Sequence, residues 1–295
     1  MRVTVLVNRS ARTVVSGELT PERVGAAFRG VRIEAKVEFV AAGEMAARAG
    51  RAAAEGAEAV VAGGGDGTVR AVAGALGGTA TPLGVLPLGT LNHFAKDLGI
   101  PADLPGAAGV VATGTTRTLD LGEVNGQVFV NNASLGFYPP VVRERDRQRR
   151  RLGRNKWVAA ASALVKVLPR VPALRLVLQV AGEEIRRTSR FVFVGNNEYS
   201  MNVFTMGARN RFDSGDLYLY IACGSGRLDL LKIALLALVR DATRSDAFES
   251  WCIPGFTIEV RRRTVPVFLD GEVLNLEPPL HFHTRARALQ VRVPA

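Results

Sequence analysis

The chain has 295 residues, of which 47% are hydrophobic and 22% charged, a composition typical of a globular protein and not of a disordered or fibrous one. Its net charge of +11 at pH 7 favours anionic partners. The two cysteines exclude a disulfide framework, and no apolar run approaches the ~20 residues that span a bilayer. We therefore expect a cytosolic protein with reduced thiols, without a signal peptide or a membrane-spanning helix.

The first 120 residues alternate between strand-like and helix-like segments. Short apolar, β-branched runs predict strands, and the amphipathic or Ala-rich runs between them predict helices. This alternation predicts a mostly parallel sheet with helices on both faces, which binds ligands in the loops at the carboxyl ends of its strands. The strands are expected at residues 2–7, 31–40, 57–62 and 83–86, and the helices at 21–28, 44–55, 69–76 and 92–98.

Beyond residue 121 the pattern changes to strands separated by turns. Strands are expected at residues 127–133, 174–180, 190–195, 217–222, 257–260 and 265–269, and helices only at 157–168 and 228–240. The fold class predicted is α/β plus β-rich. A Rossmann-like α/β nucleotide-binding domain over residues 1–121 is followed by a β-sandwich domain over residues 122–295, with the active site in the cleft between them. This prediction includes the case in which the last strand returns to the first domain.

A glycine-rich loop at residues 63–68 follows a buried strand and precedes a helix. Glycines let the backbone approach phosphate oxygens closely, and the N–H groups at the start of the helix attract anions. A tight turn that only needs positive φ angles is the alternative. The loop matches neither the Walker nor the dinucleotide fingerprint, and the chain has no G-x-S-x-G elbow and no zinc spacing among its three histidines.

Three motifs in order carry a resemblance to a known family. They are GGDGT at residues 64–68, PLGTLNHFAKDLGIP at residues 87–101 and DGE at residues 270–272. Alone, the Asp-Gly pair of the third motif is typical of an exposed hairpin turn. Together, the three resemble the diacylglycerol kinase catalytic-domain family of bacterial lipid kinases, which is related to NAD kinases and sphingosine kinases. The resemblance covers nearly the whole chain.

The resemblance implies ATP as phosphoryl donor, Mg²⁺ as the metal and a lipid hydroxyl as acceptor. Asp270 would be the general base that accepts the hydroxyl proton, with Glu272 as the second catalytic residue. Glu272 and Asp66 would support Mg²⁺ on the ATP phosphates. The nucleotide-binding residues that the resemblance implies are Asn8, Ser10, Gly64, Gly65, Asp66, Gly67, Thr68, Gly89 and Thr90.

Four positions depart from the family pattern. The loop at residues 8–11 lacks the family's proline and glycine, and no threonine stands near Val40. His93 takes the place of a common aspartate, with Asp97 one helical turn later, and Ser214 replaces an acid in a segment that holds a structural Mg²⁺ in some members. These changes indicate a subgroup with another substrate, or a weakened catalyst.

A basic segment runs from Arg143 to Lys156, with eight basic and two acidic residues. A solvated surface is the usual fate of such a run. With a lipid substrate, however, it is expected to contact anionic headgroups and hold the enzyme peripherally at the inner membrane face. No aromatic residue interleaves with it, so no nucleic-acid partner is expected. The alternatives are a kinase of the same superfold that acts on a soluble alcohol or NAD, and a non-catalytic nucleotide- or lipid-binding relative. The acceptor lipid and the oligomeric state are left open.

Overall fold

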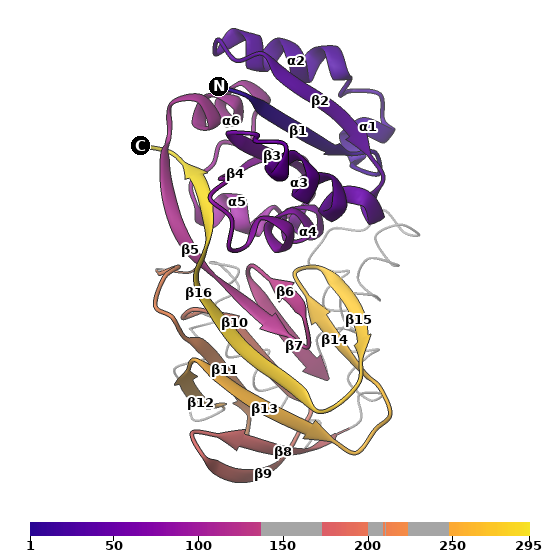
Figure 1. Cartoon of the computed structure of the whole chain (residues 1–295). Helices are drawn as coiled ribbons and strands as arrows, with labels where there is room; N and C mark the ends of the chain where they lie inside the picture. Colours follow the sequence, from indigo (N-terminus) through magenta and orange to yellow (C-terminus); the bar gives the residue numbers. More distant parts are fainter. Residues whose placement is uncertain (137–172, 200–208, 210, 224–247) are drawn as a thin grey trace, which may run out of the picture.

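The computed structural model describes residues 1–136, 173–199, 209, 211–223 and 248–295 (Figure 1). The helices expected at residues 157–168 and 228–240 lie outside the described residues, as does the basic segment from Arg143 to Lys156. Among the described residues, no helix combines the length and the apolarity that a membrane crossing requires.

The first part of the chain alternates strands and helices, as expected. Its elements are β1 (Val3–Asn8), α1 (Arg12–Val15), α2 (Pro21–Gly30), β2 (Ala35–Val40), the 3₁₀ turn η1 (Ala42–Glu44), α3 (Met45–Ala54), β3 (Ala59–Gly64), α4 (Asp66–Leu76), β4 (Leu83–Pro87), α5 (His93–Asp97) and α6 (Leu104–Thr113). The strands β2, β1, β3 and β4 are parallel neighbours in that order. Helices α2 and α6 pack on one another over one face, whereas α3 and α4 pack together over the other.

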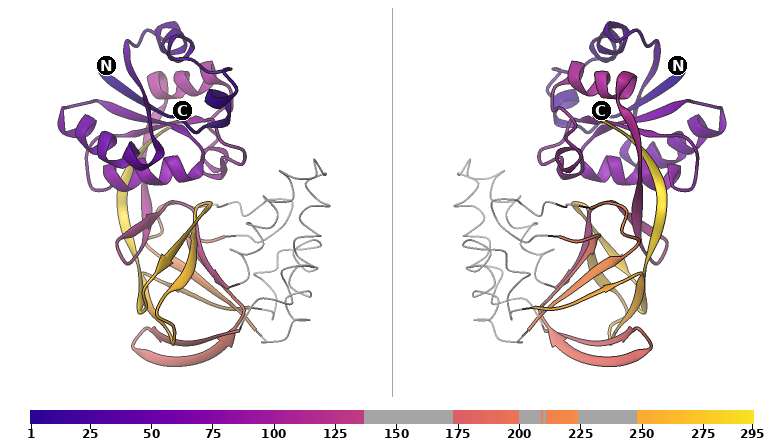
Figure 2. Two further views of the ribbon diagram at one scale, coloured as in Figure 1. Left: turned by 90° about the vertical axis from the view of Figure 1, so that its right-hand side faces the viewer. Right: turned by 90° about the vertical axis from the view of Figure 1, so that its left-hand side faces the viewer.

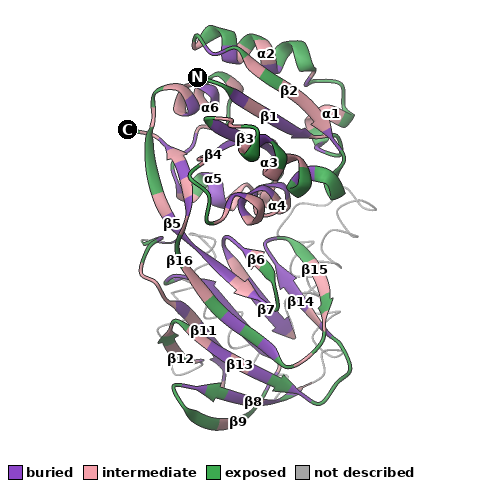
Figure 3. Cartoon of the chain, viewed as in Figure 1, coloured by how far each residue is buried: buried purple, intermediate pink, exposed green. Residues whose placement is uncertain are grey.

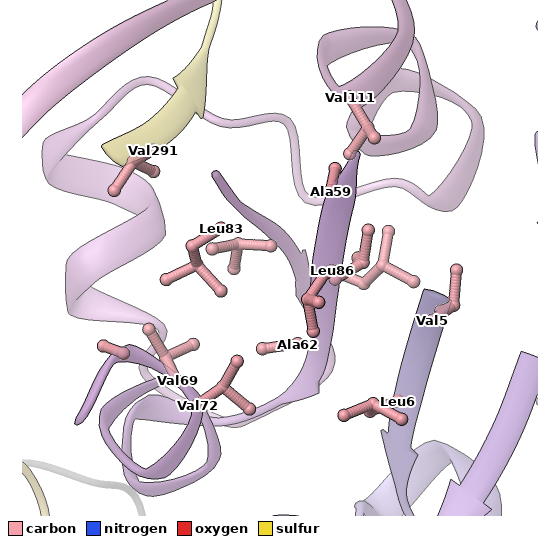
Figure 4. Packing of buried hydrophobic residues seen from close by; sticks show 14 of the residues in the cluster. Val5, Leu6, Ala59, Ala62, Val69, Val72, Leu83, Leu86, Val111 and Val291 are labelled. Atoms are coloured by element: carbon pink, nitrogen blue, oxygen red, sulfur yellow. The ribbon is translucent and has the colours of Figure 1, made fainter. Parts of the chain in front are cut away.

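Local sequence signals set the helix starts. Thr20 caps α2 by accepting a hydrogen bond from the Arg23 amide at 3.4 Å, and Asp103 caps α6 through the Gly106 amide at 2.8 Å. Strand β3 is buried along its whole length, because helices cover both faces of the sheet. The core between sheet and helices is apolar, and Figure 4 shows valine, leucine and alanine side chains of β1, β3, β4, α4, α6 and β16 in it.

The second part is built from two antiparallel sheets. Its strands are β5 (Thr115–Val124), β6 (Gln127–Phe129), β7 (Asn132–Gly136), β8 (Leu174–Val180), β9 (Glu183–Ser189), β10 (Phe191–Asn196), β11 (Leu217–Ala222), β12 (Phe248–Ile253), β13 (Gly255–Val260), β14 (Val265–Leu269), β15 (Glu272–Leu276) and β16 (Leu280–Val293). One sheet has the order β12-β11-β10-β7-β14-β15. Side chains of this sheet and of β8, β13 and β16 share one core, so the two sheets form a sandwich.

The two parts share a sheet through the long strands β5 and β16. Strand β16 pairs in parallel with β4 at Val291 and antiparallel with β13 through residues 280–283. Strand β5 lies antiparallel to β16 along most of its length. Both strands run from one part to the other along one side of the molecule (Figure 2). A ten-stranded sheet therefore continues from the parallel α/β part into the sandwich.

The predicted fold class is confirmed: a mixed α/β N-terminal part is followed by an antiparallel β part. Two predicted strands differ in extent. Residues 31–34 are not in β2, because Arg32 has a φ of 60° and turns the chain first. The strand expected at residues 127–133 divides into β6 and β7. The sequence pattern did not predict α1, η1, α6, β5, β9, β12 or β15, and it gave no bounds for β16. The edge strand β9 is mostly exposed and charged, without the alternation that predicts a strand (Figure 3).

Candidate active site

Three loops meet at the carboxyl ends of the parallel strands. Asn8 ends β1, Gly64 ends β3 and Pro87 ends β4. The sheet order reverses at β1, which lies between β2 and β3. Ligands of open α/β sheets bind at such a reversal, outside the carboxyl ends of the strands. The fold therefore places the predicted nucleotide loops where this architecture binds its ligands.

The glycines of the two phosphate-loop motifs allow their backbones to touch. A Cβ atom on Gly89 would lie 2.4 Å from the Cα of Gly65, and one on Gly64 would lie 2.3 Å from the Thr68 hydroxyl. Any side chain at these positions would separate the loops or displace the threonine. The glycines at residues 64 and 89 are therefore required by close packing and not by a positive φ angle.

Asn8 connects the loop after β1 to the GGDGT loop after β3. Its Nδ2 donates to the Thr68 hydroxyl at 2.9 Å, and its Oδ1 accepts from the Ser10 amide at 2.9 Å. These bonds fix the turn after β1, in which residues 8–11 include neither a proline nor a glycine. The side chains of Ser10 and Thr90 are exposed, and Thr68 is buried.

Asp66 connects the GGDGT loop to the second motif. Its carboxylate accepts hydrogen bonds from the backbone amides of His93 at 3.2 Å and Phe94 at 3.1 Å, the first residues of α5. An acidic group at a helix N-terminus satisfies amides that have no partner within the helix. Asn92, with a φ of 51°, accepts from the Gly89 amide at 2.9 Å and completes the connection. Asp66 thus holds the two loops in register.

Asp270 and Gly271 form the two-residue turn between β14 and β15. Their φ angles are 44° and 103°, and Leu269 pairs with Glu272 across the turn. An Asp-Gly pair with two positive φ angles is typical of a tight hairpin. An isolated hairpin turn of this kind is normally exposed, whereas Asp270 in this turn is only 3% accessible.

The Asp270 carboxylate is held by three backbone amides of one turn. Oδ1 accepts from Asn131 at 2.8 Å and Asn132 at 3.0 Å, and Oδ2 accepts from Val130 at 2.6 Å. Burial raises the pKa of the Asp270 carboxyl to about 6, although the amide bonds and Arg70 act in the opposite direction. At neutral pH the carboxylate form still predominates, by about tenfold. Each oxygen can accept two hydrogen bonds, and among the described residues Oδ2 accepts only one, so it has an acceptor position left there.

Glu272 leaves the same hairpin on the side of the nucleotide loops. Its Oε2 pairs with Arg70 of α4 at 2.5 Å, and a Cβ atom on Gly67 would lie 2.6 Å from its Oε1. The Arg70 side chain is mostly buried, and its Nε has no hydrogen-bond partner within the part of the chain that the structure describes. Glu272 is therefore the point at which the β part contacts the GGDGT loop.

The residues present fit a magnesium ion carried by a nucleotide. No group of three potential ligands gathers among the described residues, so no preformed protein cage exists there. Mg²⁺ is commonly bound by one or two carboxylates together with phosphate oxygens and waters. Asp66 and Glu272 supply such carboxylates, although in the structure the first contacts the amides of α5 and the second contacts Arg70.

Three residues in this region were not singled out from the sequence. They are Arg70, Asn131 and Arg209, which lie on α4, in the bend between β6 and β7, and in a loop without a motif. Arg70 stands two residues after the GGDGT motif, and this proximity is the one signal that points to it. The contacts of Arg209 join residues far apart in the chain, and no local pattern marks them.

The chain is similar to several known proteins. The model of the diacylglycerol kinase catalytic domain matches residues 2–124. A protein of Pseudomonas aeruginosa named "Probable lipid kinase YegS-like" is 32% identical over 260 residues, which are 83% of this chain and 79% of that protein. "Uncharacterized protein sll0036" of Synechocystis sp. is 26% identical over 76% of this chain, which spans only 52% of that relative.

The fold has a counterpart among solved structures. A crystal structure of a diacylglycerol kinase from Bacillus anthracis str. Sterne superposes with a TM-score of 0.74 at 20% identity, covering 99% of this chain and 96% of that one. Fold and site together define a kinase of the two-part, GGDGT-containing class. The chain belongs to the diacylglycerol kinase catalytic-domain family, and its matched relatives include YegS-like lipid kinases.

Proposed function

We propose that the protein transfers the γ-phosphoryl group of ATP to a hydroxyl group of a lipid such as diacylglycerol. The observation that carries the proposal is the meeting of Glu272, from the DGE hairpin, with Gly67 of the phosphate loop. This contact sets the candidate base beside the candidate phosphate site. Phosphoryl transfer depends mainly on such positioning and on neutralisation of charge.

The nucleotide phosphates bind at the loops after β3 and β4. The glycines at residues 65, 67 and 89 let the backbone approach the phosphate oxygens, and the N-terminus of α4 attracts their charge. Asn8 orients the Thr68 hydroxyl toward the same loop. When bound, Mg²⁺ neutralises phosphate charge, with Asp66 and Glu272 as the carboxylates that hold it.

Asp270 accepts the proton of the lipid hydroxyl. The proton moves to Oδ2, which has an acceptor position left among the described residues, as the hydroxyl oxygen forms its bond to the γ-phosphorus. The bond from that phosphorus to the bridging oxygen breaks, and ADP leaves. The amides of residues 130–132 fix the carboxylate, so that it does not reorganise during the step.

The test uses γ-labelled ATP, Mg²⁺ and mixed micelles that carry a panel of hydroxyl lipids. Label should enter a lipid with the natural protein and fall by about 10²–10⁴-fold in Asp270→Asn, because the amide cannot take a proton. Asp103→Asn is the matched control, since this residue caps α6, and Asn caps a helix equally well. No label in any lipid, with ATP still bound, would overturn the lipid proposal. Label in NAD or in a soluble alcohol would instead support the alternative acceptor.

We place the enzyme peripherally at the cytoplasmic membrane face, with anionic headgroups bound by the segment from Arg143 to Lys156. The charge of this segment supports the proposal, since each basic residue near an anionic surface contributes on the order of 1 kcal/mol. Replacing Arg149, Arg150 and Arg151 by Glu should sharply reduce sedimentation with anionic vesicles. ATP binding should stay as it is. Unchanged sedimentation would refute the assignment.

A further inference from the structure

Arg209 lies buried between the α/β part and the sandwich. Its side chain is 1% accessible, and each of its three guanidinium nitrogens donates a hydrogen bond. The rings of Phe212 and Tyr199 lie 4.7 Å and 5.4 Å from its Cζ atom. A buried cation with this many partners is held in one orientation, because every partner would lose its contact if the side chain moved.

One side of the guanidinium contacts the helix of the second phosphate motif. Its Nε donates to Oδ2 of Asp97, in the last turn of α5, at 3.1 Å. Burial raises the pKa of the Asp97 carboxyl, and the ion pair with Arg209 counteracts this rise. The first turn of α5 is capped by Asp66 of the GGDGT loop. Arg209 is therefore connected to the phosphate loop through the five residues of α5.

The other side contacts the turn that holds the candidate base. Nη1 donates to the carbonyl oxygen of Val130 at 2.7 Å, and Nη2 donates to Oδ1 of Asn131 at 2.9 Å. The amides of the same two residues donate to the Asp270 carboxylate. One guanidinium group thus contacts both α5 and the turn whose amides set the position of Asp270.

We propose that Arg209 is a positioning residue that, together with Asp97, fixes the distance between the phosphate loops and Asp270. The inference rests on the proposed phosphoryl transfer. Arg209 does not contact the reacting atoms. It acts through α5 on the donor side and through Val130 and Asn131 on the side of the base.

A merely structural ion pair would behave differently. Its loss would lower stability and leave the properties of the folded enzyme unchanged. Loss of a positioning residue changes turnover in the folded enzyme while nucleotide affinity is retained, because the phosphate loops keep their own hydrogen bonds. Two measurements therefore separate the two cases. One compares the change in kcat with the change in ATP affinity, and the other follows the hydrogen-exchange rates of the amides at residues 130–132.

The variants are Arg209→Met, Arg209→Lys and Asp97→Asn, with Arg292→Met as matched control. Arg292 also donates to backbone carbonyls, but those of Val111 and Ala112 at the end of α6. With diacylglycerol micelles, Arg209→Met should lower kcat by about tenfold or more and leave the calorimetric ATP affinity as it is. Arg209→Lys should restore part of the loss. Arg292→Met should keep the natural kcat.

Arg209→Met leaves Asp97 as a buried charge without its partner, which can prevent folding. The double variant Asp97→Asn/Arg209→Met removes both charges and serves in that case. Its kcat should be close to that of Asp97→Asn, because the two residues act as one unit. A kcat of the double variant at the natural level, or about tenfold or more below that of Asp97→Asn, overturns the proposal.

Hydrogen exchange tests the inference without any lipid activity. Amides within residues 128–134 should exchange faster in Arg209→Met and Asp97→Asn than in the natural protein or Arg292→Met. If the natural protein phosphorylates no lipid, the proposed function fails, and this exchange still decides whether Arg209 orders the turn. If the amides at residues 130–132 of folded Arg209→Met exchange hydrogen at the rate of the natural protein, the positioning role is overturned. An equal loss of kcat and ATP affinity also overturns it.

Discussion

The contact between the two phosphate loops makes Gly89→Ala the sharpest test of the nucleotide site. An added Cβ would lie 2.4 Å from the Gly65 Cα and 2.6 Å from the Asn92 Oδ1. Ordinary contacts begin near 3.4 Å, so the loops must separate by about 1 Å. A misplacement of this size can change a catalytic rate by about 10²-fold, and in the proposed function both loops bind the nucleotide.

We expect Gly89→Ala to bind ATP with Mg²⁺ at least about tenfold more weakly, equivalent to about 1.4 kcal/mol, as measured by isothermal titration calorimetry. Gly50→Ala is the control, because this glycine lies in α3 and its Cβ would meet nothing within 4 Å. The control should bind ATP normally and gain about 0.5–1 kcal/mol in unfolding free energy. Natural ATP affinity in folded Gly89→Ala would refute the idea that close packing of the loops builds the site.

Three further predictions follow from the same geometry. Because burial raises the pKa of Asp270 to about 6, the proton-accepting carboxylate is lost below that pH, and the transfer rate should fall about tenfold per pH unit there; a flat acid limb would contradict this. Gly67→Ala should displace Glu272 from Arg70 and lower turnover by about tenfold in the micelle assay, whereas Gly109→Ala, with open space around it, should not. Leu121→Ala should cost about 2–5 kcal/mol of unfolding free energy in urea, since its side chain is fully buried; a loss below about 1 kcal/mol would mean that the site collapses around the cavity.

The sequence predicted those features that depend on local pattern. Buried strands followed by glycine turns placed the phosphate loops, and the Asp-Gly pair is a hairpin turn that also carries a buried carboxylate. The sequence could not predict the environment of that carboxylate. Its amide donors lie 138–140 residues earlier in the chain, and the burial that raises the pKa of Asp270 comes from tertiary packing.

The ion pairs that join the two parts were also beyond sequence reasoning. Arg70 and Glu272 are 202 residues apart, and Asp97 and Arg209 are 112 apart. A single charged residue on a helix or in a loop is most often solvated, so no local pattern marks Arg209 or shows that Arg70 pairs with Glu272. The edge strand β9 was missed for a similar reason, because its charged side chains face solvent and break the apolar alternation.

The pairing of β5 with β16 limits how the molecule can change shape. Nine residue pairs are in register along the two strands, which cross together from the α/β part into the sandwich. The two parts therefore cannot swing about a free linker, and opening or closing around a nucleotide must twist this two-stranded ribbon. The register shifts between Arg285 and Leu289, where Arg287 has a φ of 53°. Bulges bend and twist a strand locally, so we expect any bending between the two parts to be concentrated at this point of the ribbon.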